Sequence, residues 1–341
     1  MEEVLCPRDA GRFIAKNSKD VSIAEEGVRS VASVLCEKYQ EKTFGVECWK
    51  SMHKLHPQMS NEDAINWVFV VDTLNFSFWA ESDDTKCLVK YKEEMYSGYW
   101  TLCAAMNRAL DEGFHMTSAS YYSNITFEEL SHVLRSDSGS PMPMLAERHR
   151  VLTETGRILV QGFGGSFLEC LRRCEHSAQA LLRLVVENFP CYRDEATFKS
   201  KRVALYKRAQ ILVADIWGLL EGKGDGFFND IGTLTMFADY RVPQALVYLG
   251  ALKYSSRLTQ KLKDGVMFES GEEQEVEIRG CSIWCVELIQ EELARLLAER
   301  GVAKAQDINA VLLDYYLWDY ARAHRDEMAH IPIHHIRCIY Y

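Results

Sequence analysis

Apolar residues recur at helical spacing along most of this chain, and this periodicity restricts its fold more than any other sequence feature. Thr126 opens a capping box of the form S/T-x-x-E, and Ser166 occupies a similar initiating position after two glycines. Two stripes that would each share one helical face are Val28, Val31, Ala32 and Leu35, and Leu102, Ala105, Met106 and Ala109. The sequence therefore predicts a compact, mainly α fold.

The predicted helices occupy the middle and the end of the chain. Besides the helix that begins after Thr126, helical periodicity covers residues 167–189, 198–220, 242–252, 282–299 and 308–325. The exception is a small β-hairpin, which short alternation around a polar tip predicts at residues 87–99. The sequence has no internal repeat and no flexible linker, so we predict a single domain over residues 1–341.

The charge balance argues against a polymeric nucleic acid as partner. The chain has 39 Lys and Arg against 49 Asp and Glu, and a net charge of −10 would repel a phosphate backbone. One phosphate can still be held by one or two cations. The apolar run at residues 65–79 is too short to span a bilayer, and residues 1–12 lack the apolar core of a secretory signal. We expect no membrane partner and a cytoplasmic location.

Cysteine and glycine patterns give no strong indication of a cofactor. The eleven cysteines are odd in number and mostly in apolar surroundings, which is typical of buried thiols in a reducing compartment. The pairs Cys170/Cys174 and Cys281/Cys285 have a wider spacing than most zinc sites use. The glycine-rich residues 162–166 lack the spacing of a P-loop or a dinucleotide site. We expect neither a metal nor a cofactor.

The segment MFADYRVPQ, residues 236–244, contains the first candidate for chemistry. Pro243 is tolerated in the first turn of a helix, so Asp239 is placed where a carboxylate meets backbone N–H groups. The more common role of such an aspartate is an N-cap or a salt bridge to Arg241. Phe237 and Tyr240 favour a catalytic role, because their rings could stack on a planar ligand on either side of the acid.

The segment LDYYLWDY, residues 313–320, is the second candidate. On a helix Asp314 would lie over Trp318, and Tyr315 over Asp319. Carboxylates accept hydrogen bonds from N–H donors and rings stack, so this face could bind a base or an amine. A structural helix with buried rings remains the alternative.

Two further residues matter only in combination with these segments. His53 alone is more typical of a core or surface histidine than of a ligand contact. Lys207 would ordinarily be a solvated helix cation, and it becomes relevant if a phosphate must be held.

Long strings of the chain carry a family resemblance. They are NWVFVVDTLNFSFW at residues 66–79, YKRAQ at 206–210, FADYR at 237–241, EIRGC at 277–281 and LDYY at 313–316. They closely resemble the queuosine salvage proteins, which are queuosine 5′-phosphate N-glycosylases. The match covers essentially the whole chain, from residue 7 to residue 341.

The resemblance implies hydrolysis of queuosine 5′-monophosphate to queuine and ribose 5-phosphate, on a helical fold reminiscent of DNA glycosylases. The roles that it implies are Asp239 as the catalytic carboxylate, Phe237 as a stacking partner, His53, Asp314, Tyr315 and Asp319 as queuine contacts, and Lys207 as the phosphate contact. It implies no metal or cofactor. We expect a monomer, although no sequence feature bears on oligomeric state directly.

The implied chemistry suits these residue types. Breaking an N-glycosidic bond builds positive charge on the sugar, which a carboxylate can stabilise, or the carboxylate can deprotonate the attacking water. A 7-deazaguanine has no N7 to protonate, so help for the leaving base must come from hydrogen bonds elsewhere on the ring. Asp314 or Asp319 facing its guanine-like N–H edge, or its side-chain amine, would suit. Two alternatives are a carrier that binds queuine or its nucleotide without cleavage, and a DNA or tRNA glycosylase, against which the net charge argues.

Overall fold

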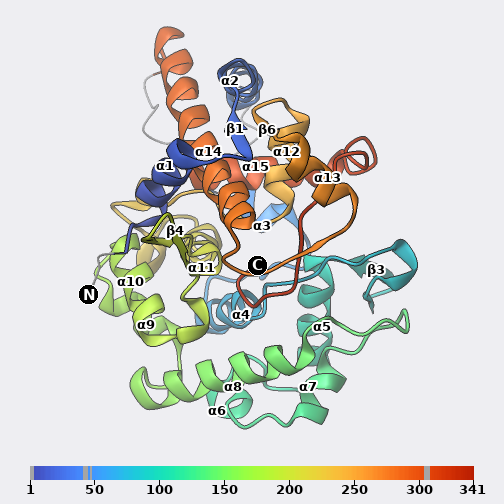
Figure 1. The fold of residues 1–341 in the computed structure, drawn as a ribbon. Coiled ribbons are helices and arrows are strands. Elements are labelled where there is room, and N and C mark those ends of the chain that lie inside the picture. The colour runs from blue at the N-terminus through green and yellow to red at the C-terminus, as the bar shows by residue number, and fades with distance from the viewer. Residues whose placement is uncertain (1–3, 41–44, 47, 303–307) are drawn as a thin grey trace.

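The computed structural model describes residues 4–40, 45–46, 48–302 and 308–341, and helices dominate it (Figure 1). The α-helices are α1 (Pro7–Asn17), α2 (Glu25–Gln40), α3 (Cys48–Met52), α4 (Glu62–Thr73), α5 (Tyr99–Asp111), α6 (Ala119–Tyr122), α7 (Phe127–Val133), α8 (Leu145–Gly162), α9 (Phe167–Arg173), α10 (Ala178–Asn188), α11 (Lys207–Leu219), α12 (Arg241–Tyr248), α13 (Ser256–Lys263), α14 (Glu273–Glu299) and α15 (Ala310–Ala323). Short 3₁₀ helices are η1 (Asp83–Thr85), η2 (Pro190–Tyr192), η3 (Gly224–Gly226) and η4 (Ile231–Thr233). The predicted mainly α fold is confirmed, and the likeness to DNA glycosylases stays a prediction.

The described strands form short two-stranded pairs. The antiparallel pairs are β1 (Val21–Ile23) with β6 (Leu252–Tyr254), β2 (Leu88–Tyr91) with β3 (Glu94–Ser97), and β4 (Glu195–Phe198) with β5 (Lys201–Ala204), while β7 (Met267–Phe268) and β8 (His335–Ile336) are parallel. The predicted hairpin is confirmed as β2–β3. Its tip residues Lys92 and Glu93 both have positive φ, 45° and 67°, which suits the right-handed twist of a tight hairpin.

The predicted helix starts and apolar faces are confirmed. Thr126 and Glu129 form the capping box of α7, and Ser166 accepts a hydrogen bond from the Leu168 N–H at the start of α9. The stripes at residues 28–35 and 102–109 are buried on α2 and α5. Apolar periodicity therefore located these helices correctly.

The predicted helix at residues 167–189 is wrong in its middle, because two helices replace it. Glu175 and His176 have positive φ values of 48° and 65°, which no right-handed helix accommodates. Ser177 then caps α10 by accepting a hydrogen bond from the Ala180 N–H at 3.1 Å.

The predicted helix at residues 198–220 is wrong in its first third. The chain there forms the β4–β5 hairpin, whose turn residues Lys199 and Ser200 have positive φ. Tyr206 also has a positive φ, 48°, and α11 begins only at Lys207. This later start places Lys207 in the first turn of α11, where the backbone N–H groups are free of partners within the helix.

The remaining predicted helices are right in kind and differ in extent. The helix at 242–252 is the shorter α12, and the chain continues into β6. The helix at 282–299 is part of the much longer α14, and the helix at 308–325 is α15, which Asn309 caps through the Leu312 N–H. These errors move helix ends but leave the buried faces unchanged.

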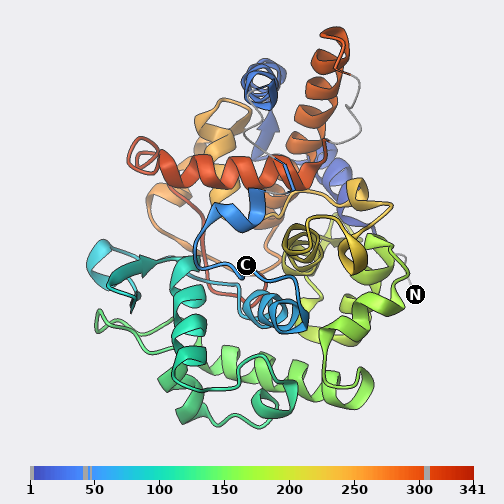
Figure 2. The ribbon, with the colours of Figure 1, turned by 180° about the vertical axis from the view of Figure 1, so that it is seen from behind.

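Buried apolar side chains form two large clusters. One draws on α4 to α11, and the other on α1, α2 and α12 to α15. Figure 1 shows α5 to α8 at the bottom and α1, α2, α12 and α14 at the top, and Figure 2 shows α15 crossing between them on the opposite face. Trp318 of α15 packs against both clusters. The single domain over residues 1–341 stays a prediction.

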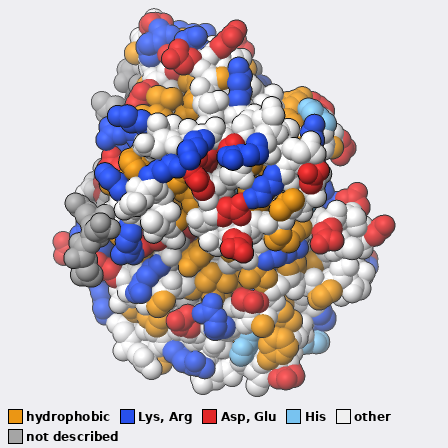
Figure 3. Space-filling model, viewed as in Figure 1, with side chains coloured by type: hydrophobic (Ala, Val, Ile, Leu, Met, Phe, Trp, Pro, Cys, Tyr) orange, Lys and Arg blue, Asp and Glu red, His pale blue; other side chains and the backbone are white. Residues whose placement is uncertain are grey.

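The surface carries both signs of charge. On the face in Figure 3, acidic and basic side chains are interspersed. The ten cysteines whose side chains the structure describes are free thiols, and most of them are buried, as the sequence predicts. In the part of the chain that the structure describes, we find no helix with both the length and the apolar character of a membrane span.

Candidate active site

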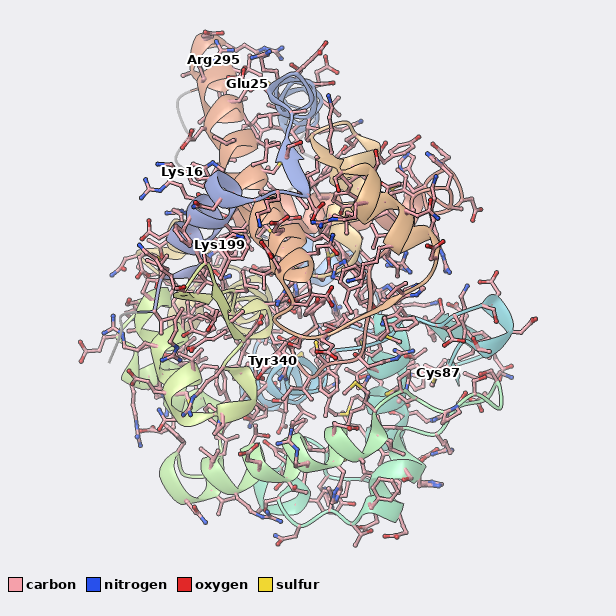
Figure 4. The ribbon with its side chains drawn as sticks, in the orientation of Figure 1. Lys16, Glu25, Cys87, Lys199, Arg295 and Tyr340 are labelled. Atoms are coloured by element: carbon pink, nitrogen blue, oxygen red, sulfur yellow. The ribbon has the colours of Figure 1, made fainter. Side chains whose placement is uncertain are left out.

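A cavity of about 290 Å³ lies where the two apolar clusters meet. Its walls come from α3, the segment after α4, the start of α5, α11, the segment before α12, and α15. Cys87, which Figure 4 labels just before hairpin β2–β3, also lies on its lining. The predicted site residues that line it are Lys207, Phe237, Asp239, Asp314 and Tyr315.

Asp239 is both a helix cap and a cavity residue. Its Oδ1 accepts hydrogen bonds from the backbone N–H groups of Arg241 at 2.8 Å and Val242 at 2.9 Å, at the start of α12. Its Oδ2 accepts none from the described residues and is not enclosed by protein atoms, so it is open to the cavity. Burial raises the pKa of Asp239, while Lys207 and the two N–H groups oppose that rise. The N-cap position of α12 is Tyr240 rather than Asp239, but the Asp239 side chain holds the first turn through Oδ1 and leaves its other oxygen available.

Asp314 is held in a similar way. Its Oδ2 accepts the Phe237 N–H at 2.9 Å, and its Oδ1 takes no hydrogen bond from the described residues. Burial, followed by the nearby charge of Asp239, raises the pKa of Asp314 well above its usual range. The ring centroids of Phe237 and Tyr315 are 6.1 Å apart, so a ring from each segment lies beside the acid.

Asp215 is the third carboxylate on the lining. Its Oδ1 accepts the indole N–H of Trp49 and the phenol O–H of Tyr315, both at 2.9 Å. Burial raises its pKa to about 7, while the hydrogen bonds from Tyr315 and Trp49 and the charge of Lys207 oppose the rise. We call Asp215, Asp239 and Asp314 the cavity carboxylates. Each has one oxygen fixed by the protein and one that is open to the cavity.

Lys207 places a cation beside these acids. It is 6% exposed, and its backbone N–H donates to Asp194 Oδ2 at 3.0 Å. Burial lowers the pKa of Lys207, and the carboxylates of Asp239 and Asp72 counteract this. No ion pair or hydrogen bond among the described residues occupies its ammonium. The ammonium is therefore available to a ligand.

Aromatic rings form an aromatic wall of the cavity. The rings of Trp100 and Trp318 are 5.9 Å apart and nearly perpendicular, and Tyr99 contacts both of them edge-on. The Arg322 guanidinium lies 5.2 Å from the Trp100 ring centroid and 4.9 Å from that of Trp318. Such a wall suits a planar ligand, because rings stack on it.

Comparison with known proteins identifies the family. A model of the family described as queuosine salvage protein matches residues 55–341. The chain belongs to the queuosine salvage protein family. It is 59% identical to the queuosine 5′-phosphate N-glycosylase/hydrolase of Bos taurus, over 100% of both chains. It is 58% identical to the protein of that name from Mus musculus, over 99% of both chains, and 37% identical to the one from Schizosaccharomyces pombe, over 96% of this chain and 97% of that one.

Two residues that the queuosine salvage resemblance assigns to the base lie just outside the cavity lining. His53 stacks on Trp100 with ring centroids 3.8 Å apart, and its pKa falls to about 4, chiefly through burial. Its Nδ1 accepts the Leu55 N–H at 3.2 Å, which leaves Nε2 as a donor. Asp319 is exposed on α15 near Arg322, and partial desolvation of its carboxyl group raises its pKa. Their contacts with a ligand stay predictions.

Sequence reasoning missed Asp215, Trp49, Tyr99 and Trp100, whereas it had already placed Trp318 beside Asp314. A lone acid inside the apolar run ILVADIWGLL, residues 211–220, is the signal that could have found Asp215. Trp49 and Trp100 carry no comparable signal, because a buried tryptophan is common in any core.

A second group of buried charges supports the site in this family member. Arg279 binds Asp194 through both terminal nitrogens, at 2.9 and 2.5 Å, and Glu275 at 3.2 Å. Glu275 also accepts the Tyr341 O–H at 2.6 Å. We call these four residues the paired network. The Arg279 Nε donates to the carbonyl of Ala238 at 2.9 Å, so the network holds the residue before Asp239.

The structure offers no ready metal site within the residues it describes. No group of three or more His, Cys, Asp or Glu side chains there is arranged to hold an ion.

Proposed function

We propose that this protein hydrolyses the N-glycosidic bond of queuosine 5′-monophosphate and releases queuine and ribose 5-phosphate, which returns queuine for insertion into tRNA. Membership of the queuosine salvage family supports this proposal, as do the relatives named queuosine 5′-phosphate N-glycosylase/hydrolase. The cavity is of a size for a base and its sugar, and it combines stacking rings with carboxylates.

One observation carries the catalytic assignment. Asp239 Oδ1 is fixed by two backbone N–H groups, while Oδ2 is free of protein partners in the described structure and open to the cavity. A carboxylate that is held rigidly by one oxygen presents the other without the cost of reorganising during the reaction. This is the arrangement that a group needs if it is to face a sugar that becomes cationic.

The proposed reaction uses Asp239 in its ionised form. As the bond between the anomeric carbon and the base breaks, positive charge develops on the sugar, and Oδ2 stabilises it. The attacking water gives up a proton, which Asp239 can accept. Burial raises the pKa of Asp239 and so makes it a stronger base, while Lys207 favours its ionised form.

The base would lie between the aromatic residues and Asp314. Burial raises the pKa of Asp314 well above its usual range, which favours the protonated form, and in that form Asp314 can donate from its open oxygen. Its other oxygen holds the Phe237 N–H, so the acid and the proposed stacking ring share one fixed geometry. Tyr315, His53 and Asp319 complete the proposed base contacts.

Lys207 is the proposed contact of the 5′-phosphate. Its ammonium is buried in the cavity wall and unoccupied by any acid of the described residues. Other cations on the lining are Lys86, Arg241, Arg322 and Arg325. We further propose that the substrate is the free nucleotide rather than a polynucleotide, since the net charge is −10, and that the protein acts as a monomer.

Asp239→Asn tests the proposal. Asparagine keeps an oxygen for the two N–H groups of α12 and loses the negative charge, so we expect a folded protein whose kcat falls by about 10²- to 10³-fold or more. The measurement is release of ribose 5-phosphate from queuosine 5′-monophosphate by mass spectrometry. If the protein were only a carrier, even the unmodified protein would return the nucleotide intact.

Asp230→Asn is the matched control. Asp230 also accepts backbone N–H groups at a helix start, from Ala178 at 2.5 Å and Gln179 at 3.2 Å, but it does not line the cavity. We expect normal turnover from it. Near-normal turnover by Asp239→Asn would refute the catalytic assignment of Asp239.

A further inference from the structure

Asp215 lies on the same face of α11 as Lys207. Lys207, Ile211 and Asp215 follow at intervals of four residues, and all three line the cavity. Asp215 is 4% exposed, so protein atoms surround most of it, and the cavity is one of the few places where it is accessible. The resemblance and the sequence patterns give this residue no role.

Two hydrogen bonds determine which oxygen of Asp215 can carry a proton. Oδ1 accepts both the Trp49 N–H and the Tyr315 O–H, at 2.9 Å each, and these two bonds occupy its lone pairs. Oδ2 accepts nothing from the described residues and is not enclosed by protein atoms. A proton on this carboxyl group therefore sits on Oδ2, where it points to the cavity rather than to the protein.

Building on the proposed function, we propose that Asp215 is a further catalytic residue, which hydrogen-bonds the departing base through Oδ2–H and protonates it as the glycosidic bond breaks. The electron pair of that bond goes to the base, and the Asp215 proton goes to an acceptor nitrogen or oxygen of its ring system. Water adds its oxygen to the sugar and gives its proton to Asp239. Exchange of one proton through solvent, from Asp239 to Asp215, restores the starting state.

The acidity of Asp215 suits this role. A general acid works best when its pKa lies near the working pH. Burial raises the pKa of Asp215 to about 7, and its open oxygen Oδ2 faces the cavity. The deazapurine base has no N7 to protonate, so a positioned acid has more to contribute than it would for a purine.

Several titratable groups face Asp215 and set its proton affinity. They are Lys207 on α11 itself, Asp72 on α4, Tyr99 and Cys103 on α5, and Asp314 and Tyr315 on α15. Burial raises the pKa values of Asp72, Asp314, Tyr99, Tyr315 and Cys103, which favours the neutral form of each. Lys207 is the neighbour whose charge lowers the pKa of Asp215.

Asp215→Asn is the first test, with queuosine 5′-monophosphate as the probe. Asparagine preserves the acceptor for Trp49 and Tyr315 but cannot give up a proton. We expect kcat to fall by about 10²-fold or more, with little change in KM. We also expect the decline of kcat/KM above pH about 7, which the unmodified protein shows as Asp215 ionises, to disappear. An unchanged kcat, a change confined to KM, or a persisting alkaline decline would each overturn the proposal.

Trp49→Phe gives a second readout that does not remove the carboxyl group. Losing one N–H donor to the carboxylate disfavours its charged form, so the pKa of Asp215 rises and the alkaline decline moves to higher pH. A decline that stays in place or moves to lower pH contradicts the role of Asp215. If instead the unmodified protein releases no base at any pH, the proposed function fails, and this outcome is separate from a failure of Asp215 alone.

Discussion

The protein buries two groups of charged side chains side by side, and they differ in how completely they are paired. In the paired network, Arg279 has each of its charged nitrogens directed at Asp194, Glu275 or the Ala238 carbonyl. The cavity carboxylates each have one oxygen open. Buried charges that find all their partners stabilise a geometry, and those left half-paired are available for chemistry.

The two groups are also connected. Arg279 holds the carbonyl next to Asp239, and Asp194 accepts the backbone N–H of Lys207. The paired network thus fixes the two segments that bring Asp239, the proposed catalytic acid, and Lys207 together. The role that we propose for the paired network is indirect, through position, whereas we propose that the cavity carboxylates act on the ligand.

Breaking the paired network should produce the largest change. Arg279→Met leaves Asp194 and Glu275 buried without a cation, and removing one partner of a buried pair costs about 3–5 kcal/mol. We expect the free energy of unfolding, from urea titration, to fall by that amount. The matched control is Arg295→Met at the outer end of α14 (Figure 4), where the side chain is 52% exposed and pairs with Glu292 and Glu299.

Arg295→Met should lower the free energy of unfolding by less than about 1 kcal/mol, because water screens exposed ion pairs. Equal losses for Arg279→Met and Arg295→Met would show that the paired network does not stabilise the fold as its burial indicates.

Lys207→Met should produce the next largest change, and in activity rather than stability. Lys207 opposes the rise in the pKa of Asp239, so without it that pKa rises further, and the ionised form needed for catalysis appears only at higher pH. A hydrogen bond to a charged group is worth about 1.5–3 kcal/mol, so loss of the phosphate contact should lower kcat/KM by roughly 10- to 100-fold. The measurement is kcat/KM against pH.

Comparing the nucleotide with the unphosphorylated nucleoside separates the two roles of Lys207. A phosphate contact predicts that Lys207→Met affects the nucleotide much more, whereas an effect through Asp239 predicts equal losses for both. Lys199→Met, on the exposed β4–β5 turn labelled in Figure 4, is the control and should leave both substrates unaffected. Normal kcat/KM for both substrates in Lys207→Met would remove this residue from the site.

Helix content was predictable from the sequence, and the helix breaks were not. Apolar spacing reflects burial on one face, and that information is local. The breaks at Glu175, His176 and Tyr206 use positive φ at residues other than glycine, which tertiary packing imposes and composition does not reveal. The late start of α11, which puts Lys207 in its first turn, is one of the features that the sequence did not predict.

The site was predictable where its residues lie close together in sequence. Asp239 with Phe237, and Asp314 with Tyr315, each combine an acid and a ring within one or two positions. Asp215 could not be found in this way, because its partners Trp49 and Tyr315 are 166 and 100 residues away. Only folding brings that carboxylate to its donors.

A smaller effect should appear in the pH dependence of stability. The raised pKa of Asp314 means that the folded state holds a proton which the unfolded chain releases near pH 4, so stability falls as pH rises above that value. Asp314→Asn removes this loss. The free energy of unfolding of the variant should therefore rise relative to that of the unmodified protein as the pH increases from 5 to 8. One unit of pKa shift is worth about 1.4 kcal/mol, which denaturant titration resolves.

Asp137→Asn is the control of opposite sign. Burial tends to raise the pKa of Asp137, but the Lys90 N–H and Arg108 outweigh it and lower that pKa, so its stabilising effect is present above pH 4. Asp137→Asn should therefore be less stable than the unmodified protein by a constant amount from pH 5 to pH 8, the range over which the gain of Asp314→Asn grows. If the free energies of unfolding of the two variants changed with pH in parallel, this result would contradict the half-paired state of Asp314.

The smallest effect is expected at His53, at the edge of the cavity. Its Nε2 is a donor, because Nδ1 accepts the Leu55 N–H, and with a pKa near 4 the ring is neutral at pH 7. A neutral hydrogen bond contributes about 0.5–1.5 kcal/mol, so His53→Ala should raise KM by up to about tenfold with kcat unchanged. His53→Phe keeps a ring to stack on Trp100 and loses the donor, so it should raise KM as much. A normal KM for His53→Phe would mean that His53 acts through Trp100 alone, which would place it with the supporting residues rather than with the groups that contact the base.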